Sequence, residues 1–355
     1  MKKNNVIITA GVFVVLVTLT LFALVTNRNR GEVAQGSEDV AAFYKGKIIK
    51  WIIPYSPGGG YDEYARILSP YLSKYTGARV DVLNLPGAGG MRGVNELYSS
   101  PNDGLIIGMI NGSALVTAEM SGISGANYKL DQFAYMGRIV ADARVLVVSK
   151  QSGLNTFEDM INAQTPLKVG ATGLGGSTYV DAVVSKETFN LNIEIIHGFD
   201  SSSIIRQEML RGNIVGTWGS YGSAEEGVDE GAETIILQSG SKRLPDLQQV
   251  PTVFEYVDKT QSPERTKAIL TAWDALIAVG RSVAAPPGIS AERLEFLRAA
   301  FKSTMEDPEL QALSLKSGRP FDFASGEDIH KITLAATVMP PDIKELFIKA
   351  IKGEL

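Results

Sequence analysis

At 355 residues the chain is longer than one ordinary domain, so two structural units are expected. The net charge is −5, with acidic and basic residues interspersed and no basic stripe, which argues against nucleic acid as the main partner. The sequence has no cysteine and two histidines, which excludes structural disulfides, cysteine nucleophiles, and metal sites built from thiolates or from several histidines.

The N-terminus contains a long apolar segment. Residues 6–26 carry no charge and are numerous enough to span a bilayer as a helix. Because no small-x-small cleavage site follows, we predict a signal anchor over residues 1–30 that keeps the chain at the membrane, with a cleaved signal peptide as the alternative. Residues 31–43 are small and polar and are expected to form a tether. In both cases the rest of the chain is expected to be periplasmic or otherwise extracytoplasmic.

From residue 47 onwards, short apolar runs alternate with amphipathic helical stretches. Strands are expected at 50–54, 80–85, 105–110, 144–149, 167–171, 193–196, 214–218, 234–238 and 275–279. Helices are expected at 61–75, 93–99, 179–189, 203–210 and 292–305. Thr156 and Ser290 stand where helix N-caps are expected, the former with Asp159 three residues on. The alternation predicts an α/β fold with largely parallel sheets.

Three glycine-rich loops, at residues 58–60, 84–93 and 170–178, each join an expected strand to an expected helix. In the first, three consecutive glycines free the amide N–H groups to face an anion beside the positive end of a helix dipole. The alternative is a tight strand-to-helix turn. In parallel sheets such loops lie at the carboxyl ends of strands, where ligands bind. None of the loops contains a nucleotide-triphosphate P-loop, and none places Gly-x-Gly-x-x-Gly in register for a dinucleotide.

Four motifs between about residues 47 and 320 carry a more specific signal. In chain order they are Pro54-x-x-Pro57-Gly58-Gly59-Gly60-x-Asp62-x-x-Ala65-Arg66; Asn84-x-Pro86-Gly87-Ala88-Gly89-Gly90-x-x-Gly93 with Pro101-Asn102-Asp103-Gly104; the loop Gly173–Ser177; and Leu244-Pro245-Asp246-x-x-x-Val250-Pro251-Thr252 with Pro286-Pro287-Gly288-Ile289-Ser290-Ala291-Glu292. In this order and spacing they resemble the solute-binding receptors of tripartite tricarboxylate transporters, the TctC or Bug family of periplasmic binding proteins.

The resemblance implies an α/β, two-lobed periplasmic-binding-protein fold of type II, the Venus-flytrap architecture, preceded here by the N-terminal hydrophobic helix. Lobe 1 is expected over residues 44–142 and 253–355, and lobe 2 over residues 143–252. The family holds a small organic carboxylate between the lobes by main-chain amides and ordered water, and hands it to the permease subunits of the transporter. The chain departs from the family pattern at Asn102, after Ile196, and at Gly219–Gly222, which leaves the identity of the acid open.

The expected ligand-binding residues follow from the loops and from nearby aromatic side chains. They are Tyr55, Ser56, Gly58, Gly59, Gly60, Tyr61, Asp62, Ala88, Gly89, Gly173, Gly175, Gly176, Ser177, Thr178, Trp218 and Tyr221. Asp62 could instead cap its helix, and Arg66, at i+4, is expected to pair with Asp62 rather than with the ligand. Trp218 and Tyr221 could equally belong to the core. We expect no catalytic residues, no cofactor and no metal.

Three functions remain open from the sequence. The first is a solute receptor that presents a carboxylate to a tripartite tricarboxylate-type permease. The second is a ligand-sensing ectodomain that signals through a membrane partner. The third is an enzyme on the same scaffold, which has little support because the chain shows no clear pairing of a nucleophile with a base.

Overall fold

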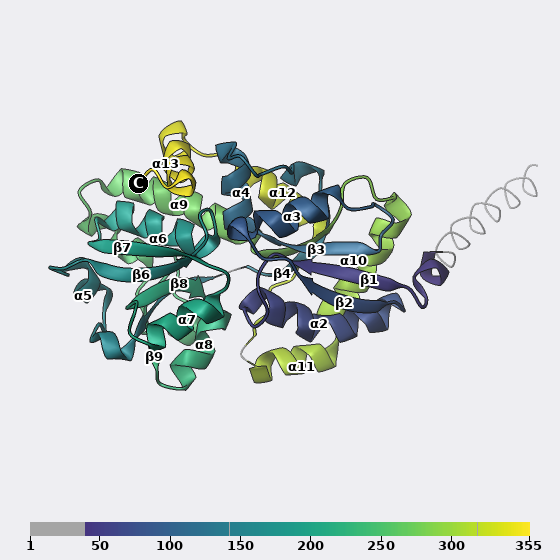
Figure 1. Cartoon of the computed structure of the whole chain (residues 1–355), viewed down its shortest axis with the longest axis horizontal. Coiled ribbons are helices and arrows are strands. Elements are labelled where there is room, and N and C mark those ends of the chain that lie inside the picture. The colour runs from purple at the N-terminus through teal and green to yellow at the C-terminus, as the bar shows by residue number, and fades with distance from the viewer. Residues whose placement is uncertain (1–39, 142, 318) are drawn as a thin grey trace, which may run out of the picture.

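The computed structural model describes residues 40–141, 143–317 and 319–355. Two β-sheets flanked by helices lie side by side along the long axis of the molecule (Figure 1). Within the described ranges, no helix is both long and apolar enough to cross a membrane. The predicted anchor at residues 6–26 lies outside these ranges.

The first sheet has six strands in the order β11-β4-β10-β3-β1-β2. Its strands are β1 (Ile48–Ile53), β2 (Arg79–Asn84), β3 (Ile106–Asn111), β4 (Ala134–Val140), β10 (Arg281–Ala285) and β11 (Ala324–Ser325). The helices that follow its strands are α2 (Gly60–Thr76), α3 (Met91–Ser99), α4 (Gly112–Ser121), α10 (Ala291–Met305), α11 (Pro308–Ser317) and α12 (Gly326–Ala336).

Side chains of β1 alternate between the two faces of this sheet, as the two-residue period of a strand requires. Trp51 is buried on one face with Leu68 of α2 and Phe301 of α10. Ile52 is buried on the other face with Leu97 of α3. The sheet is therefore covered on both faces, which explains why its central strands read as continuous apolar runs.

The second sheet has five strands in the order β7-β6-β8-β5-β9. They are β5 (Arg144–Ser149), β6 (Leu167–Thr172), β7 (Ile193–Phe199), β8 (Gly216–Ser220) and β9 (Glu233–Gln238), and their helices are α5 (Phe157–Ile161), α6 (Ser177–Phe189), α7 (Ser202–Leu210) and α8 (Tyr221–Asp229). Val147 packs with Met209 of α7 on one face, and Leu146 shares the core with Val180 of α6 on the other.

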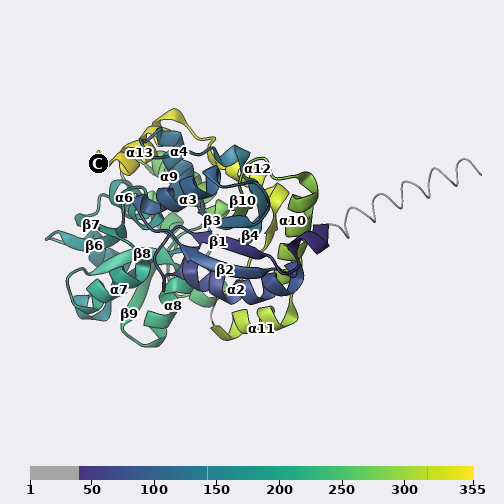
Figure 2. The same ribbon diagram turned by 45° about the vertical axis from the view of Figure 1, so that its right-hand side comes forward.

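Two further helices, α9 (Pro263–Val279) and α13 (Pro341–Lys352), join the halves of the molecule. Both lie along the upper side of the molecule beside α4 and α6 (Figures 1 and 2). One hydrophobic core runs from Leu115 of α4 through α9 and α13 to the second sheet. Within it the rings of Trp273 (α9) and Trp218 (β8) meet edge to face, with centroids 5.1 Å apart. The two sheets are thus held together along one side.

The structure corrects two expectations about the elements. The sheets are mixed, not largely parallel, because β10 runs antiparallel to β3 and β4, and β5 runs antiparallel to β8 and β9. Residues 275–279 are not a strand but the last turns of α9, since a short apolar run does not distinguish a buried strand from a buried helix end. The elements that were not anticipated are helices α4, α8, α9, α11, α12 and α13 and strands β4, β10 and β11. The N-caps Thr156 and Ser290 are confirmed by their side-chain hydrogen bonds.

Candidate functional site

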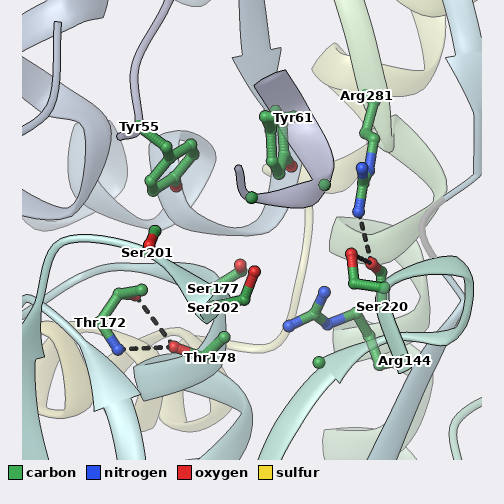
Figure 3. Close-up of a pocket in the computed structure, with 14 residues that line it drawn as sticks. Tyr55, Tyr61, Arg144, Thr172, Ser177, Thr178, Ser201, Ser202, Ser220 and Arg281 are labelled. Carbon is green, nitrogen blue, oxygen red and sulfur yellow. Dashed lines mark hydrogen bonds between the residues drawn. The ribbon is translucent and has the colours of Figure 1, made fainter. Parts of the chain in front are cut away.

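A narrow cavity of about 40 Å³ lies between the two sheets, with room for about three water molecules (Figure 3). Glycines, hydroxyl side chains, two tyrosines and two arginines line it: Tyr55, Gly59, Gly60, Tyr61, Arg144, Thr172, Ser177, Thr178, Ser201, Ser202, Gly219, Ser220, Ser223 and Arg281. Among the residues that the structure describes, none of those that line it is acidic. The surroundings therefore favour an anion or a hydroxylated solute over a cation.

The topology explains why these segments meet. Most of the lining follows the carboxyl ends of β1, β6, β7 and β8. Arg144 and Arg281 instead begin β5 and β10, the strands that run antiparallel to their neighbours. In the ladders, Arg144 faces Ser220 and Arg281 faces Asn111, at the carboxyl ends of β8 and β3. Reversal of a strand brings its first residue to the edge of the sheet where its neighbours end.

Two helix N-termini border the cavity. Gly59 is the N-cap of α2 and Gly176 is the N-cap of α6, and in the described part of the chain neither helix has a side-chain cap hydrogen bond. The first turns of both helices contribute lining residues. Free amide N–H groups and the positive ends of two helix dipoles therefore lie close to this space, and both favour a bound anion.

A hydrogen-bond network crosses the cavity wall between the halves. Asn111, which ends β3, donates from Nδ2 to the Tyr55 hydroxyl at 2.7 Å and to Ser177 Oγ at 3.1 Å. Tyr55 in turn donates to the carbonyl of Gly89 at 3.1 Å. Only 2% of Asn111 is exposed. Its amide thus ties Tyr55, and through Tyr55 the second glycine loop, to the N-terminus of α6 in the other half.

The second and third glycine loops touch each other through their backbones. Gly89 has φ +65°, and a Cβ there would lie 2.7 Å from the Gly176 amide nitrogen and 2.7 Å from the Leu174 carbonyl oxygen. Such distances require a backbone to shift, so only glycine permits this approach. These loops therefore serve the contact between the halves as well as the cavity.

Six predicted ligand-binding residues line the cavity: Tyr55, Gly59, Gly60, Tyr61, Ser177 and Thr178. The rings of Tyr55 and Tyr61 are 4.9 Å apart and form one wall. The Thr178 hydroxyl accepts a hydrogen bond from the Thr172 amide at 2.8 Å (Figure 3).

The other predicted residues lie outside the lining, and those of the second and third loops lie at the contact between the halves. Ala88 and Gly89 belong to the short 3₁₀ turn Ala88–Gly90. A Cβ on Gly173 would lie 3.2 Å from the Gly89 amide nitrogen. Gly175 faces Ile351 of α13.

Gly58 and Asp62 shape the first loop, while Ser56 lies outside the lining. The Asp62 carboxylate accepts hydrogen bonds from the Gly58 amide at 3.0 Å and from Arg66 Nε and Asn84 Nδ2, each at 2.9 Å. The expected pairing of Arg66 with Asp62 is thus confirmed. Burial raises the pKa of Asp62, but the hydrogen bonds from Arg66, Gly58 and Asn84 together outweigh it and lower that pKa. The ionised carboxylate holds the loop in shape.

The two aromatic candidates of the second half have different surroundings. Trp218 is 1% exposed and donates from Nε1 to Ser185 Oγ at 3.0 Å. This burial favours a place in the core, which was the alternative to ligand binding for this residue. Tyr221 lines a neighbouring cavity of about 400 Å³, which also borders Ser220 and Arg281. Burial, together with Glu225, raises the pKa of Tyr221.

Eight lining residues were not among the expected ones: Arg144, Thr172, Ser201, Ser202, Gly219, Ser220, Ser223 and Arg281. In the sequence, Gly219 and Ser220 stand out only as a departure from the family pattern. The sequence feature that could have identified Arg144 is a cationic side chain at the first position of an otherwise apolar strand. Among the described residues, no group of His, Cys, Asp and Glu could hold a metal ion.

Comparisons with known proteins agree with the motifs. The family described as tripartite tricarboxylate transporter family receptor, TctC, matches residues 64–333. A UPF0065 protein in the tcbD-tcbE intergenic region of Pseudomonas sp. (strain P51) is 26% identical over 266 residues, which covers 74% of this chain and 75% of that protein. Protein BugT of Bordetella pertussis is 30% identical over 119 residues, which covers 33% of this chain and 36% of BugT.

Solved structures show the same fold. The periplasmic binding protein BugD has a TM-score of 0.72 at 19% identity, covering 86% of this chain and 98% of BugD. MatC from Rhodopseudomonas palustris with bound malate has a TM-score of 0.69 at 16% identity, covering 85% of this chain and 99% of MatC. The predicted two-lobed periplasmic-binding-protein fold is therefore confirmed. Because the family match spans more than half of the sequence, the chain belongs to the TctC family of tripartite tricarboxylate transporter receptors and is a solute-binding receptor of that family.

Proposed function

We propose that this receptor captures a small organic carboxylate in the cavity between its lobes and delivers it to the membrane permease of a tripartite tricarboxylate-type transporter. The observation that carries the proposal is the cavity lining. It combines two helix N-termini, several hydroxyl groups and two buried arginines, without an acidic residue among the described residues that line it. Two structural neighbours from R. palustris support it, one with bound malate and one with adipate.

The proposed binding residues are those residues of the first and third glycine loops that line the cavity. Lobe 2 is taken as residues 143–252. A space of about 40 Å³ is too small for an acid of malate size, so entry requires the lobes to separate. A ligand that contacts both lobes then favours the closed arrangement, because it binds that state better than the open one. The permease would recognise the surface of the closed, ligand-bound receptor.

We place the receptor outside the cytoplasm, as its family implies. Retention at the membrane through residues 6–26 stays a prediction from the sequence. Anchoring would keep the receptor at high local concentration near its permease.

A thermal-shift screen of the purified full chain tests the proposal. The panel contains malate, adipate, citrate and benzoate, together with neutral amides and sugars. An acid that binds the folded state raises the melting temperature as its concentration increases. A saturable shift with an acid and none with the neutral compounds supports a carboxylate receptor. Absence of any shift with the acids, in a protein that unfolds cooperatively, would overturn it.

A further inference from the structure

A second cavity adjoins the small one between the lobes. It has about 400 Å³ of space, against about 40 Å³ in the small cavity. Tyr64 of α2 lines it from lobe 1, and Tyr221 of α8 and Leu244 line it from lobe 2. Ser220 and Arg281 line both cavities. The two spaces are therefore neighbouring compartments of one interlobe cleft.

Side chains from both lobes form the boundary between the compartments. The guanidinium carbon of Arg281 lies 4.5 Å from the ring centroid of Tyr61, which lines the small cavity, and 4.8 Å from that of Tyr64, which lines the larger one. Arg281 Nη2 donates to Ser220 Oγ of the other lobe (Figure 3). Because this hydrogen bond joins opposite lobes, it breaks when they separate, and the compartments then open into one space.

The small cavity matches a carboxylate group and little more. Its space takes about three water molecules, and a carboxylate group has three heavy atoms. The N-termini of α2 and α6 and several hydroxyl groups border it. A solute that places its carboxylate here must extend its remaining atoms into an adjoining space. The larger cavity is such a space, on the other side of the Arg281–Ser220 boundary.

The inner walls of the larger cavity offer mostly carbon to a solute. The Tyr64 hydroxyl donates to the Pro320 carbonyl at 3.0 Å, and the Tyr221 hydroxyl lies within hydrogen-bonding reach of Glu225. The two hydroxyls thus have protein partners, and the rings are left as apolar surfaces. Leu244 adds an aliphatic side chain from lobe 2. An apolar body gains free energy from burial against such walls.

The outer rim of the larger cavity carries acids from both lobes. Asp246 of lobe 2 and Asp322 of lobe 1 are exposed, and both line the cavity. Carboxylates at this rim repel a second carboxylate at the far end of a solute. Asp322 pairs with Arg138, which offsets part of its charge, so Asp246 is the acid to test.

We propose that the two cavities form one solute site, in which the small cavity holds a carboxylate and the larger one holds an apolar, uncharged body of the same molecule. The solute class is then a monocarboxylate with an aromatic or aliphatic body, in preference to a short di- or tricarboxylate. An apolar cavity of about 150 Å³ suffices for benzene, so the larger cavity has room for a ring and a short chain. The inference rests on the proposed carboxylate-receptor function and names the class of acid.

Isothermal titration calorimetry on the full chain tests this with two matched pairs of acids. Hexanoate is compared with adipate, and 3-phenylpropanoate with 3-(4-carboxyphenyl)propanoate, so that the acids of a pair differ by one terminal carboxylate. The monocarboxylate of each pair is expected to bind at least about tenfold more tightly. The reason is that the second carboxylate loses hydration against apolar walls and meets the acids of the rim.

A blocking variant tests the larger cavity itself. Leu244→Trp narrows this cavity from lobe 2 and should weaken binding of 3-phenylpropanoate by about tenfold or more, the loss expected when a phenyl ring is no longer buried. Leu210→Trp is the matched control, since Leu210 is a 45% exposed leucine of lobe 2 that lines neither cavity. Its affinity should equal that of the wild type.

A charge variant tests the rim and predicts a gain of binding, which a folding defect does not produce. Asp246→Asn should raise the affinity for 3-(4-carboxyphenyl)propanoate by about two- to fivefold, the range for exposed charges. Its affinity for 3-phenylpropanoate should not change. Asp258→Asn alters an exposed acid that lines neither cavity, and it should change neither affinity.

The outcomes separate this inference from the function on which it rests. Dicarboxylates that bind as tightly as their monocarboxylate partners, or unchanged binding of 3-phenylpropanoate in Leu244→Trp, would overturn the two-compartment site and leave the carboxylate receptor intact. Binding of malate or citrate with no binding of either monocarboxylate would do the same. Unchanged affinities in Asp246→Asn would overturn the role of the rim. A wild-type chain that binds none of these acids would overturn both the inference and the receptor function.

Discussion

Replacement of Gly89 by alanine is expected to weaken ligand binding without unfolding the protein. The added Cβ would lie 2.7 Å from two backbone atoms of the opposite lobe, Gly176 N and Leu174 O, and 3.1 Å from the Gly175 carbonyl carbon. Backbone atoms cannot rotate away as a side chain can. The simplest relief is a slight separation of the lobes, so the substitution penalises the closed state selectively.

The magnitude follows from two separable effects. Gly89 has φ +65°, and a left-handed alanine costs about 1–2 kcal/mol in both the open and the closed state, so this strain cancels in binding. The steric conflict arises only on closure and, like overpacking elsewhere, should cost about 1–3 kcal/mol. The dissociation constant of the best acid is therefore expected to rise by about 5- to 150-fold.

Isothermal titration calorimetry measures this change, and Gly122→Ala provides a matched control. Gly122 has φ +60° at the end of α4, with nothing within 4 Å of its added Cβ. The control has the same backbone strain, so its stability should fall slightly. Its affinity for the acid should be unchanged. Wild-type affinity in Gly89→Ala, or an equal loss in both variants, would refute the closure argument.

Three other outcomes are expected. Asp181→Ala removes the buried carboxylate that pairs with Arg144 and should lower the free energy of unfolding by about 3–5 kcal/mol in urea titrations; a loss below about 1 kcal/mol would contradict a buried pair. Burial raises the pKa of Asp274 to about 6 from 3.8, so the folded state holds this proton to higher pH and loses stability as the pH rises through that window. Asp274→Asn should therefore stabilise the protein at pH 7 by up to about 3 kcal/mol, and a gain that persisted at pH 4 would disprove the mechanism. Ser177→Ala removes a cavity hydroxyl that accepts from Asn111 and should raise the dissociation constant about fivefold, with full affinity counting against its proposed contact.

The strand-to-helix junctions and the family can be inferred from the sequence alone. Periodicity and capping residues located most strands and about half of the helices in the described residues, because those signals act within a few residues of each other. Glycine loops between strands and helices pointed to Tyr55, Tyr61 and Ser177, which do line the cavity. The spacing of four motifs then implied the two-lobed receptor fold that the comparisons confirm.

The distant segments that complete the cavity are brought together only by long-range packing. Arg144 and Arg281 are separated by well over one hundred residues. Arg144 looked like a polar residue at the start of an apolar strand, and the strand that Arg281 begins was not anticipated. They reach the site because β5 and β10 run antiparallel to their neighbours, which an apolar run does not reveal. Trp218 packs in the core against Trp273 of α9. The end of that helix was expected to be a strand. Strand direction and long-range packing are collective properties, so only the folded chain shows where these side chains point.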